Sequence, residues 1–481
     1  MGAVSSIRQR GRQAVKGSIH FPCTGGQRRL WGLSGRNPGE WQDNLTTVYD
    51  IQGAIDTVLL ERALHVVRSR HEALRTSIRM RGIDLVQVVH PARYRPLRAT
   101  LVDRHELDAH GGISGYVARR IERPFFLSSG PLWRFELLHL GSDRSLFIVC
   151  SHHIVSDGIS MEIVWHEVVI AYNELLARAC LPVTSRRKSF GDFAQWLSNW
   201  TMQSHFTAPF VRYWTPVLAG PAWPHLRWHD GCRASSFRGK ALRGHLPDAC
   251  YRASRLARER FGVTDYVVAL AAYLVTVHLH SGETDLALIS PFSGRRAPGL
   301  QDVVGRLMTG HVIRYRFEPT CSAGALLSAL ASHVAATLDY QDLPFEWLSD
   351  EFELAARQPV DQIRFALEDF SGAVSSLGGA RVNALEYGSH SGPKRDLNLY
   401  VRVYQNHWNL VVQFNQDVLS EDSVARLMQT FCAALLACAA DDDTSVAQRT
   451  ATLETAAEGR VQWKDQQERL IEMSSFEELK I

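Results

Sequence analysis

The amino-acid sequence predicts a mixed α/β fold, of the α+β kind, arranged as two lobes. Its 481 residues, of which 45% are hydrophobic and 21% charged, can bury a substantial core and are long for a single one. Strand-like alternation and helical periodicity follow one another along the chain, and both begin again near Gly239 after a basic, polar stretch. We therefore expect each half of the chain to fold around its own core.

In the first half, apolar patterns predict a hairpin that leads into a helix. Strand-like runs lie at 44–51, 85–89 and 132–140, and a turn over 141–144 connects the last run to another that ends at His152. Helices are expected from Asp56, over 113–123 and after Gly158, where apolar residues recur at helical spacing.

The second half repeats this mixture of elements. Strands are expected after Gly239 and over the ranges 285–291, 363–368, 397–405 and 407–415. Helices are expected over 251–260, 264–279 and 423–439, and the second of these is strongly apolar.

Four segments follow from these patterns. We expect a basic disordered tail over 1–18, an N-terminal lobe over 19–183, a C-terminal lobe over 184–446 that begins with an inter-lobe linker, and a C-terminal tail or linker over 447–481.

Composition excludes several classes of protein. The net charge of +3 comes from 53 basic and 50 acidic residues, a balance that gives no support to nucleic-acid binding. No apolar run approaches the roughly 20 residues that cross a bilayer, and the N-terminus has no signal-peptide core. The eight cysteines form no Cys-x-x-Cys pair, which fits free thiols in a reducing cytosol. We expect a cytoplasmic monomer without a membrane or nucleic-acid partner.

The stretch Ser-His-His-Ile-Val-Ser-Asp-Gly over 151–158 carries the candidate chemistry. Neighbouring side chains of an extended segment point to opposite faces, so one of His152 and His153 faces a cavity while the other packs behind it. Asp157 either orients an imidazole or pairs with a distant arginine, and Gly158 permits a positive φ or a close backbone approach. A lone histidine in a strand is usually structural, whereas this ordered set is rarer by chance.

This His-His-x-x-x-Asp-Gly set closely resembles the signature of the condensation-domain superfamily, whose acyltransferases depend on carrier proteins or coenzyme A. Four other stretches resemble family motifs in the family's order. They are 24–31, with Gly26 in place of a usual Ala, then 70–76 (Arg-His-Glu-Ala-Leu-Arg-Thr), 190–196 (Phe-Gly-Asp-Phe-Ala-Gln-Trp) and 339–348, which contains Leu-Pro-Phe-Glu. We assign 70–76 to folding and the aromatics of 190–196 to the core.

The fifth motif is where the chain departs from the family. The family usually has Ile-Gly-x-Phe-Val-Asn-Thr-Leu, and residues 304–311 are Val-Gly-Arg-Leu-Met-Thr-Gly-His. Thr309 and Gly310 stand where Asn-Thr is usual, and His311 adds a titratable group. Properties of the family's tunnel wall are therefore not carried over to this segment.

The resemblance implies an architecture and a set of roles. Two lobes similar to chloramphenicol acetyltransferase would form a V with a central tunnel, which carrier arms enter from opposite faces. His153 would be the catalytic residue, His152 a supporting one, and Arg295 of the family's Gly-Arg turn would pair with Asp157 to hold the loop at Gly158. No metal and no cofactor would bind to the chain itself, because substrates arrive on the 4'-phosphopantetheine of acyl or peptidyl carrier proteins.

Three functions remain open at the level of sequence. The first is condensation of a carrier-bound acyl or aminoacyl thioester with an amine or alcohol acceptor, giving an amide or ester in nonribosomal peptide or hybrid natural-product biosynthesis. The second is an O-acyltransferase of the same superfamily that uses coenzyme A or a carrier. The third is a noncatalytic domain that recruits a carrier or partner enzyme, against which the intact His153 and Asp157 argue.

Overall fold

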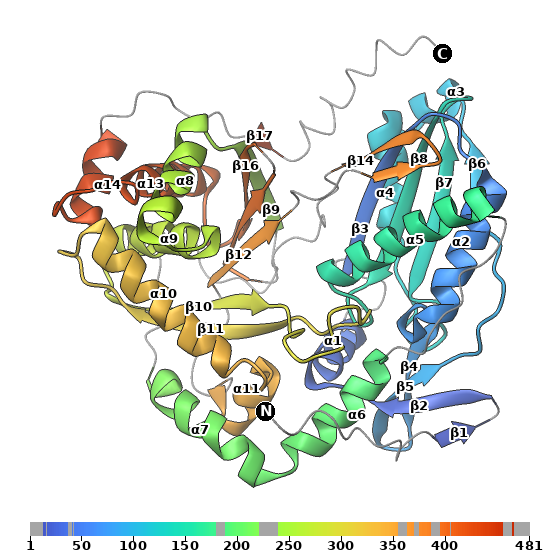
Figure 1. Cartoon of the computed structure of the whole chain (residues 1–481), viewed down its shortest axis with the longest axis horizontal. Coiled ribbons are helices and arrows are strands. Elements are labelled where there is room, and N and C mark those ends of the chain that lie inside the picture. The colour runs from blue at the N-terminus through green and yellow to red at the C-terminus, as the bar shows by residue number, and fades with distance from the viewer. Residues whose placement is uncertain are drawn as a thin grey trace.

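The chain folds into two lobes that stand side by side and meet at their base, as the two arms of a V (Figure 1). The computed structural model describes residues 13–15, 17–36, 41, 43–178, 188–220, 239–354, 363–369, 375–385, 395–404, 406–455 and 464–465. Residues 184–187 of the inter-lobe linker predicted over 184–189, and most of both predicted tails, lie outside these residues. The tunnel implied by the resemblance stays a prediction.

The N-terminal lobe contains a six-stranded sheet with the order β13-β14-β3-β8-β7-β6. Its strands are β3 (Asn44–Gln52), β6 (Arg98–Leu101), β7 (Trp133–His139), β8 (Arg144–His152), β13 (Ser375–Leu377) and β14 (Ala380–Leu385). The predicted hairpin is present, because β7 and β8 pair antiparallel with Leu138 opposite Leu146. β8 lies between β3 and β7, so it is held on both edges.

Helices and a smaller sheet complete this lobe. The helices are α1 (Gly25–Arg36), α2 (Thr57–Arg70), the 3₁₀ turn η1 (Glu72–Arg75), α3 (Arg104–Asp108), α4 (Gly112–Ile121) and α5 (Gly158–Arg178). The small sheet has the order β1-β2-β5-β4, formed by β1 (Gln13–Val15), β2 (Ser18–Pro22), β4 (Thr76–Arg81) and β5 (Asp84–Val89). α2 begins where expected, because the Asp56 carboxylate caps the backbone N–H groups of Val58 and Leu59.

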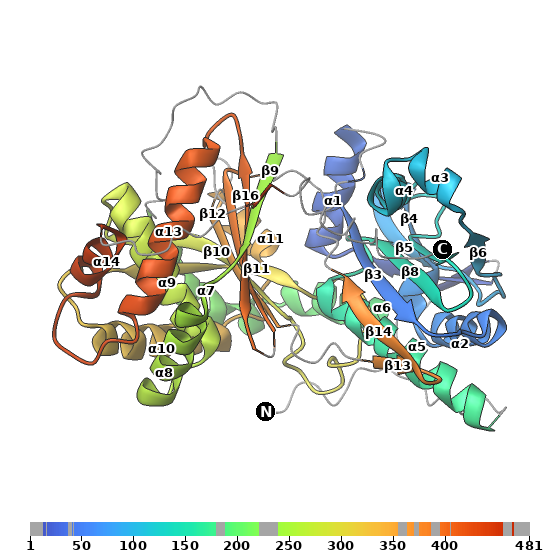
Figure 2. The same cartoon turned by 90° about the horizontal axis from the view of Figure 1, so that it is seen from above.

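The C-terminal lobe is a seven-stranded sheet covered by helices on one side (Figure 2). Its order is β11-β10-β12-β15-β16-β9-β17, with β9 (Gly239–His245), β10 (Asp285–Phe292), β11 (Thr309–Arg316), β12 (Ile363–Asp369), β15 (Leu397–Val403), β16 (Trp408–Asn415) and β17 (Lys464–Asp465). The covering helices are α8 (Asp248–Phe261), α9 (Asp265–Ser281), α10 (Ala323–Asp339), α13 (Glu421–Ala437) and α14 (Val446–Thr455). Three further helices, α6 (Phe190–Thr201), α7 (Ser204–Leu218) and α11 (Phe345–Glu351), lie at the base of the V (Figure 1).

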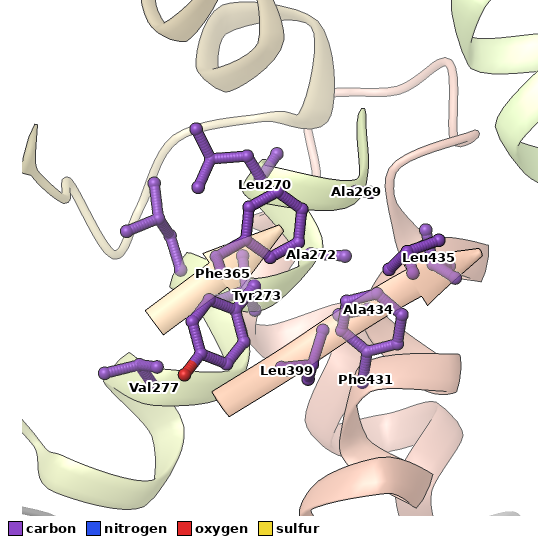
Figure 3. Packing of buried hydrophobic residues seen from close by; sticks show 14 of the residues in the cluster. Ala269, Leu270, Ala272, Tyr273, Val277, Phe365, Leu399, Phe431, Ala434 and Leu435 are labelled. Atoms are coloured by element: carbon purple, nitrogen blue, oxygen red, sulfur yellow. The ribbon is translucent and has the colours of Figure 1, made fainter. Parts of the chain in front are cut away.

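The helix α9, predicted as strongly apolar, is the centre of this lobe. Tyr273 of α9 and Phe365 of β12 stack with ring centroids 5.6 Å apart, and Phe431 of α13 lies in the same cluster (Figure 3). All three side chains are fully buried. A helix that is apolar on every side is stable here because the sheet and its neighbouring helices cover all its faces.

The structure differs from the expected boundaries at three places. Residues 13–15, predicted as disordered, pair with β2 as β1. Residues 375–385, predicted within the C-terminal lobe, form β13 and β14, and β14 extends the N-terminal sheet along β3. Residues 447–455, predicted as a tail, continue α14, which packs on α13. Short-range patterns locate such elements, but only long-range pairing decides to which core they belong.

Among the described residues, no single helix is both long and apolar enough to cross a membrane. α8 and α9 pass that test only together, as a pair bent by 113°.

Candidate active site

The histidine stretch lies where β8 ends and α5 begins. His152 is the last residue of β8, and Gly158 is the first residue of α5. Neighbouring segments fix the backbone here: the N–H of His152 donates to the carbonyl of Leu132 at 3.0 Å, and the N–H of His153 donates to the carbonyl of Asp43 at 2.8 Å. The predicted strand therefore places the two histidines at the C-terminal end of an interior strand of the six-stranded sheet.

The two histidines have different surroundings. His152 is buried, its Nδ1 accepts the N–H of Ile154 at 3.0 Å, and its ring meets Phe125 edge-on. His153 is partly exposed, and its Nδ1 lies 2.7 Å from the carbonyl oxygen of Ser156. The alternation expected for an extended segment thus separates a packed imidazole from an accessible one.

The hydrogen bond of His153 fixes its tautomer. Because a carbonyl oxygen only accepts, Nδ1 carries the proton and donates a hydrogen bond to the carbonyl of Ser156. Nε2 of the neutral ring therefore keeps its lone pair. Burial, and then the positive charge of Arg306, lower the pKa of His153 below its ordinary value. This imidazole is therefore neutral at neutral pH and can accept a proton at Nε2.

Asp157 is completely buried and pairs with Arg295, as the sequence predicted. Nη1 and Nη2 of Arg295 donate to its two carboxylate oxygens at 3.0 and 2.9 Å. The backbone N–H groups of Leu307 and Met308 donate to Oδ2, each at 3.0 Å. Although burial raises the pKa of Asp157, Arg295 and these hydrogen bonds hold it below its ordinary value. Asp157 makes no contact with His153 that would relay a proton, and it ties α5 to the segment between β10 and β11.

Ser160, which sequence reasoning missed, completes this connection. Its backbone N–H and hydroxyl lie 2.8 and 2.7 Å from Oδ1 of Asp157, and the hydroxyl is 2.8 Å from the carbonyl of Gly305. The N–H of Gly305 and Nη2 of Arg295 donate to the same hydroxyl, each at 3.0 Å. The spacing of Asp157 and Ser160, typical of an Asp capping the third following residue, is the sequence signal for this contact.

The first motif supports the histidine loop from the other side. Gln27 of α1 is fully buried and donates from Nε2 to the carbonyl of Ile154 at 3.0 Å. Its Oε1 accepts the N–H of Thr24, whose hydroxyl caps the N–H of Gln27 at 3.3 Å. Thr24 therefore caps α1, and the reciprocal Thr-x-x-Gln box also holds the loop that precedes Asp157.

The prediction for Gly158 was wrong. Gly158 does not adopt a positive φ, and a Cβ built on it would meet no atom within 4 Å. It is exposed at the start of α5, five residues after His153. Its small size leaves space beside the loop and is not required by the backbone.

The second and fourth motifs have structural positions, as predicted. Glu167 of α5 accepts from Nη1 of Arg70 at 3.1 Å and lies 3.2 Å from Nε2 of His71, which joins the end of α2 to α5. In α6, Phe190 packs so closely on Gly305 that a Cβ on this glycine would lie 2.3 Å from the ring. Both motifs position the site without reaching His153.

The altered residues of the fifth motif also serve the fold. His311 is fully buried, and its ring lies between those of Trp214 and Phe292, at 5.9 and 5.1 Å. Burial lowers its pKa to about 4, so it is a neutral ring of the core and not an added acid or base. The hydroxyl of Thr309 accepts the N–H of Phe345 at 3.2 Å, at the first turn of α11.

A second, largely buried ion pair contains Arg306, whose charge acts on His153, and it was not anticipated. Nη2 of Arg306 is 3.4 Å from Oε1 of Glu346 on α11, with side-chain exposures of 14% and 11%. Gly26 makes room for it, because a Cβ there would lie 1.5 Å from Nη1 of Arg306. The replacement of the usual Ala by Gly26 was the one sequence signal of this arrangement.

The described residues contain no group of three or more His, Cys, Asp or Glu side chains that could hold a metal ion.

Comparison with known sequences identifies relatives across most of the chain. A family model described as a condensation domain matches residues 18–459. Chondramide synthase cmdD of Chondromyces crocatus is 28% identical over 432 residues, which are 87% of this chain and 11% of that synthase. Gramicidin S synthase 2 of Brevibacillus brevis is 28% identical over 433 residues, 87% of this chain and 9% of that protein. The chain thus spans about a tenth of the length of these two relatives.

Solved structures share the fold at lower identity. The X-domain from teicoplanin biosynthesis aligns with a TM-score of 0.77 at 20% identity, covering 92% of this chain and 98% of that one. The first condensation domain of the calcium-dependent antibiotic synthetase, solved with a substrate analogue, aligns with a TM-score of 0.75 at 19% identity, covering 89% and 99%. The two-lobed arrangement predicted from the sequence is therefore the fold of these proteins.

Proposed function

Because the chain belongs to the condensation-domain family, we propose that it joins a thioester donor to an amine or alcohol acceptor. The donor is an acyl or aminoacyl group on the 4'-phosphopantetheine of a carrier protein, and the product is an amide or ester of a peptide or hybrid natural product. The names of the relatives, synthases of chondramide and gramicidin S, support this class of product. One observation carries the proposal: the carbonyl of Ser156 holds His153, the residue that the motif resemblance makes catalytic, as a neutral base.

The proposed step is a nucleophilic addition to the thioester carbonyl. As the acceptor's oxygen or nitrogen forms its bond to the carbonyl carbon, Nε2 of His153 takes the proton that the acceptor loses. The tetrahedral intermediate then breaks its carbon–sulfur bond, and the proton returns from the imidazole to the leaving thiol. The hydrogen bond from Nδ1 to Ser156 keeps Nε2 in the accepting form and orients the ring throughout.

Amide and ester formation depend on His153 to different degrees. An alcohol is a poor nucleophile until it is deprotonated, whereas a neutral amine attacks without help. For an amine acceptor, positioning and stabilisation of the oxyanion contribute more than proton transfer. We therefore expect the effect of losing His153 to be larger for an alcohol acceptor.

The test is a reconstitution in which a carrier-bound donor and the matching small thioester are offered amine and alcohol acceptors. We expect His153→Ala to lower the rate of ester formation by at least about a hundredfold, since general base catalysis contributes roughly 10² to 10⁴. His166→Ala is the matched control, because His166 is an exposed histidine on α5. Product is measured by mass spectrometry.

The outcomes separate the other two functions. Equal turnover of coenzyme A or small thioesters and of the carrier-bound donor would favour the carrier-independent O-acyltransferase. Unchanged rates in His153→Ala would remove this residue from the chemistry. Absence of turnover in the native chain with every donor, together with binding of a carrier protein, would favour the recruiting domain.

A further inference from the structure

The small sheet of the N-terminal lobe, at the lower right of Figure 1, has one face turned away from the core. Side chains of β4 alternate between its two faces: Ile78 is fully buried in the core, whereas its neighbour Arg79 is exposed. The hydroxyl of Ser77, two residues before Arg79, lies 2.8 Å from Nε2 of His90, which follows β5. His90 and Arg79 therefore lie on the same outer face.

Arginine side chains surround two histidines on this face. Burial, and then nearby positive charge, lower the pKa of both His20 of β2 and His90 below the ordinary value. The charges that act on the two rings belong to Arg75, Arg79, Arg81, Arg93 and Arg95. Because Arg79 acts on both rings, β4 and the segment after β5 present their positive charge to one area.

Three of these arginines lack a counter-charge. Arg79, Arg93 and Arg95 are exposed, and none of them forms an ion pair with a carboxylate among the described residues. The carboxylate of the β4–β5 hairpin, that of Asp84, lies opposite Arg81. Like charges that gather without a counter-charge repel one another, so an anionic partner is favoured at this face.

Helix α8 carries exposed arginines of the opposite kind. Three of them lie on this helix, and each is close to a carboxylate of the same chain. The pairs are Arg255 with Glu259 at 3.2 Å, Arg258 with Asp265 at 2.6 Å and Arg260 with Asp441 at 3.5 Å. The arginines of α8 are therefore paired within the chain, whereas the three on the small sheet are available to another molecule.

Exposed apolar side chains border the same three arginines. Ile83, in the turn between β4 and β5, is 94% exposed, and Tyr94, in the segment after β5, is 54% exposed. Arginine and tyrosine are enriched where proteins bind proteins, and exposed apolar groups gain free energy when an apolar partner covers them. The basic face is defined by these side chains, namely Arg79, Ile83, Arg93, Tyr94 and Arg95.

We propose that the basic face is a docking surface for an acidic protein, whose carboxylates pair with the three arginines and whose apolar side chains cover Ile83 and Tyr94. Nucleic acid offers no comparable apolar surface to Ile83, because its exposed backbone is a row of phosphates. Recognition of anionic lipid takes clusters of about 4 to 8 basic residues, more than this face has. The docking does not involve His153, so it is independent of the proposed function.

The test measures binding of the full chain to four probes. They are an amphipathic peptide of Glu and Leu at helical spacing, the same peptide with Gln in place of Glu, a duplex DNA, and vesicles of phosphatidylserine and phosphatidylcholine. We expect the Glu–Leu peptide to bind most tightly of the four, with an affinity that falls as salt is added, since salt screens exposed charges. Fluorescence anisotropy measures the peptides and DNA, and cosedimentation measures the vesicles.

Variants of the basic face separate its two contributions. Replacing Arg79, Arg93 and Arg95 together with Gln should weaken binding of the Glu–Leu peptide by roughly 5- to 50-fold, the sum of three exposed charge pairs. Ile83→Ser should weaken it by about 3- to 10-fold without changing its salt dependence, because the lost contact is apolar. All four side chains are exposed, so both variants should melt at the Tm of the native chain.

The matched controls come from α8. Replacement of Arg255, Arg258 and Arg260 with Gln, and Leu256→Ser at a side chain that is 45% exposed, should leave the affinity unchanged. Equal losses in the two triple variants, or no binding of the Glu–Leu peptide to the native chain, would overturn the proposal. Tighter binding of DNA or vesicles that depends on the three arginines but not on Ile83 would assign the face to a polyanion and overturn it as well.

Discussion

Two buried arginine–carboxylate pairs lie near His153, and they differ in how completely their partners are used. Asp157 accepts from two nitrogens of Arg295, from the N–H and hydroxyl of Ser160, and from the backbone of the fifth motif. Glu346 meets Arg306 through one contact of 3.4 Å. The carboxylate of the first pair is held by several short hydrogen bonds, while that of the second meets its arginine through one long contact; Nε of both arginines is buried without an acceptor among the described residues.

The two pairs have the same chemistry but differ in how strongly the surrounding chain holds them. Removing one partner of the pair with several short hydrogen bonds leaves the other charge buried and uncompensated. A loosely paired arginine contributes less to stability, because one long hydrogen bond adds less than several short ones. Sequence spacing alone does not distinguish them, since both are Arg–acid pairs far apart in the chain.

The largest expected effect concerns the pair of Asp157 and Arg295. We expect Asp157→Ala to lower the free energy of unfolding by about 3 to 5 kcal/mol, because Arg295 would remain buried without its counter-charge. Denaturant unfolding followed by fluorescence measures this loss. The control is Asp339→Ala, which removes an exposed partner of Arg296 and should cost about 0 to 1 kcal/mol. Unchanged unfolding in both Asp157→Ala and Arg295→Ala would contradict a structural role for the pair.

Ser160→Ala should have the next largest effect. The change removes a hydroxyl that serves Asp157, Arg295 and Gly305, and it leaves the buried N–H of Gly305 without this acceptor. We expect a loss of about 1 to 3 kcal/mol in the free energy of unfolding. Ser332→Ala is a suitable control, since its exposed hydroxyl bonds only within α10 among the contacts described. A loss no greater than that of the control would show that the connection does not depend on Ser160.

For the loosely paired arginine we expect a small effect on stability. Arg306→Gln removes one long hydrogen bond, and Arg29 still acts on Glu346 after the change, so we expect the free energy of unfolding to fall by about 1 kcal/mol. Thermal and denaturant unfolding alongside Asp157→Ala provide the comparison. Equal losses of unfolding free energy in Arg306→Gln and Asp157→Ala would contradict the distinction between the pairs.

The pH dependence should show which arginine acts on His153. Burial and Arg306 lower the pKa of this imidazole below its ordinary value of 6.5. The imidazole therefore stays neutral at a pH somewhat below 6.5, and activity falls only as the pH drops further. Removing the cation in Arg306→Gln raises the pKa of His153, which moves the acid limb of kcat/KM to higher pH. The limb of Arg296→Gln should coincide with that of the native chain, and a coincident limb in Arg306→Gln would exclude the electrostatic effect.

Local sequence by itself determined much of the site. The run that ends at His152 reads as a strand and the residues after Gly158 as a helix, because their apolar periods of 2 and 3.6 differ. The pairing of Asp157 with Arg295 was implied by the resemblance to the family's motifs. Gly158 was misread, because glycine at a loop suggests a special backbone angle, whereas here it leaves open space.

Only the tertiary structure decided which distant segments meet. β14 lies in the second half of the sequence but pairs with β3 of the first lobe, and His311 looks titratable in sequence yet stacks in a core between Trp214 and Phe292. The fit of Arg306 into the space left by Gly26 joins residues 280 positions apart, and neither residue predicts the other alone. Backbone periodicity is a local property, whereas burial and pairing depend on which surfaces the completed fold brings together.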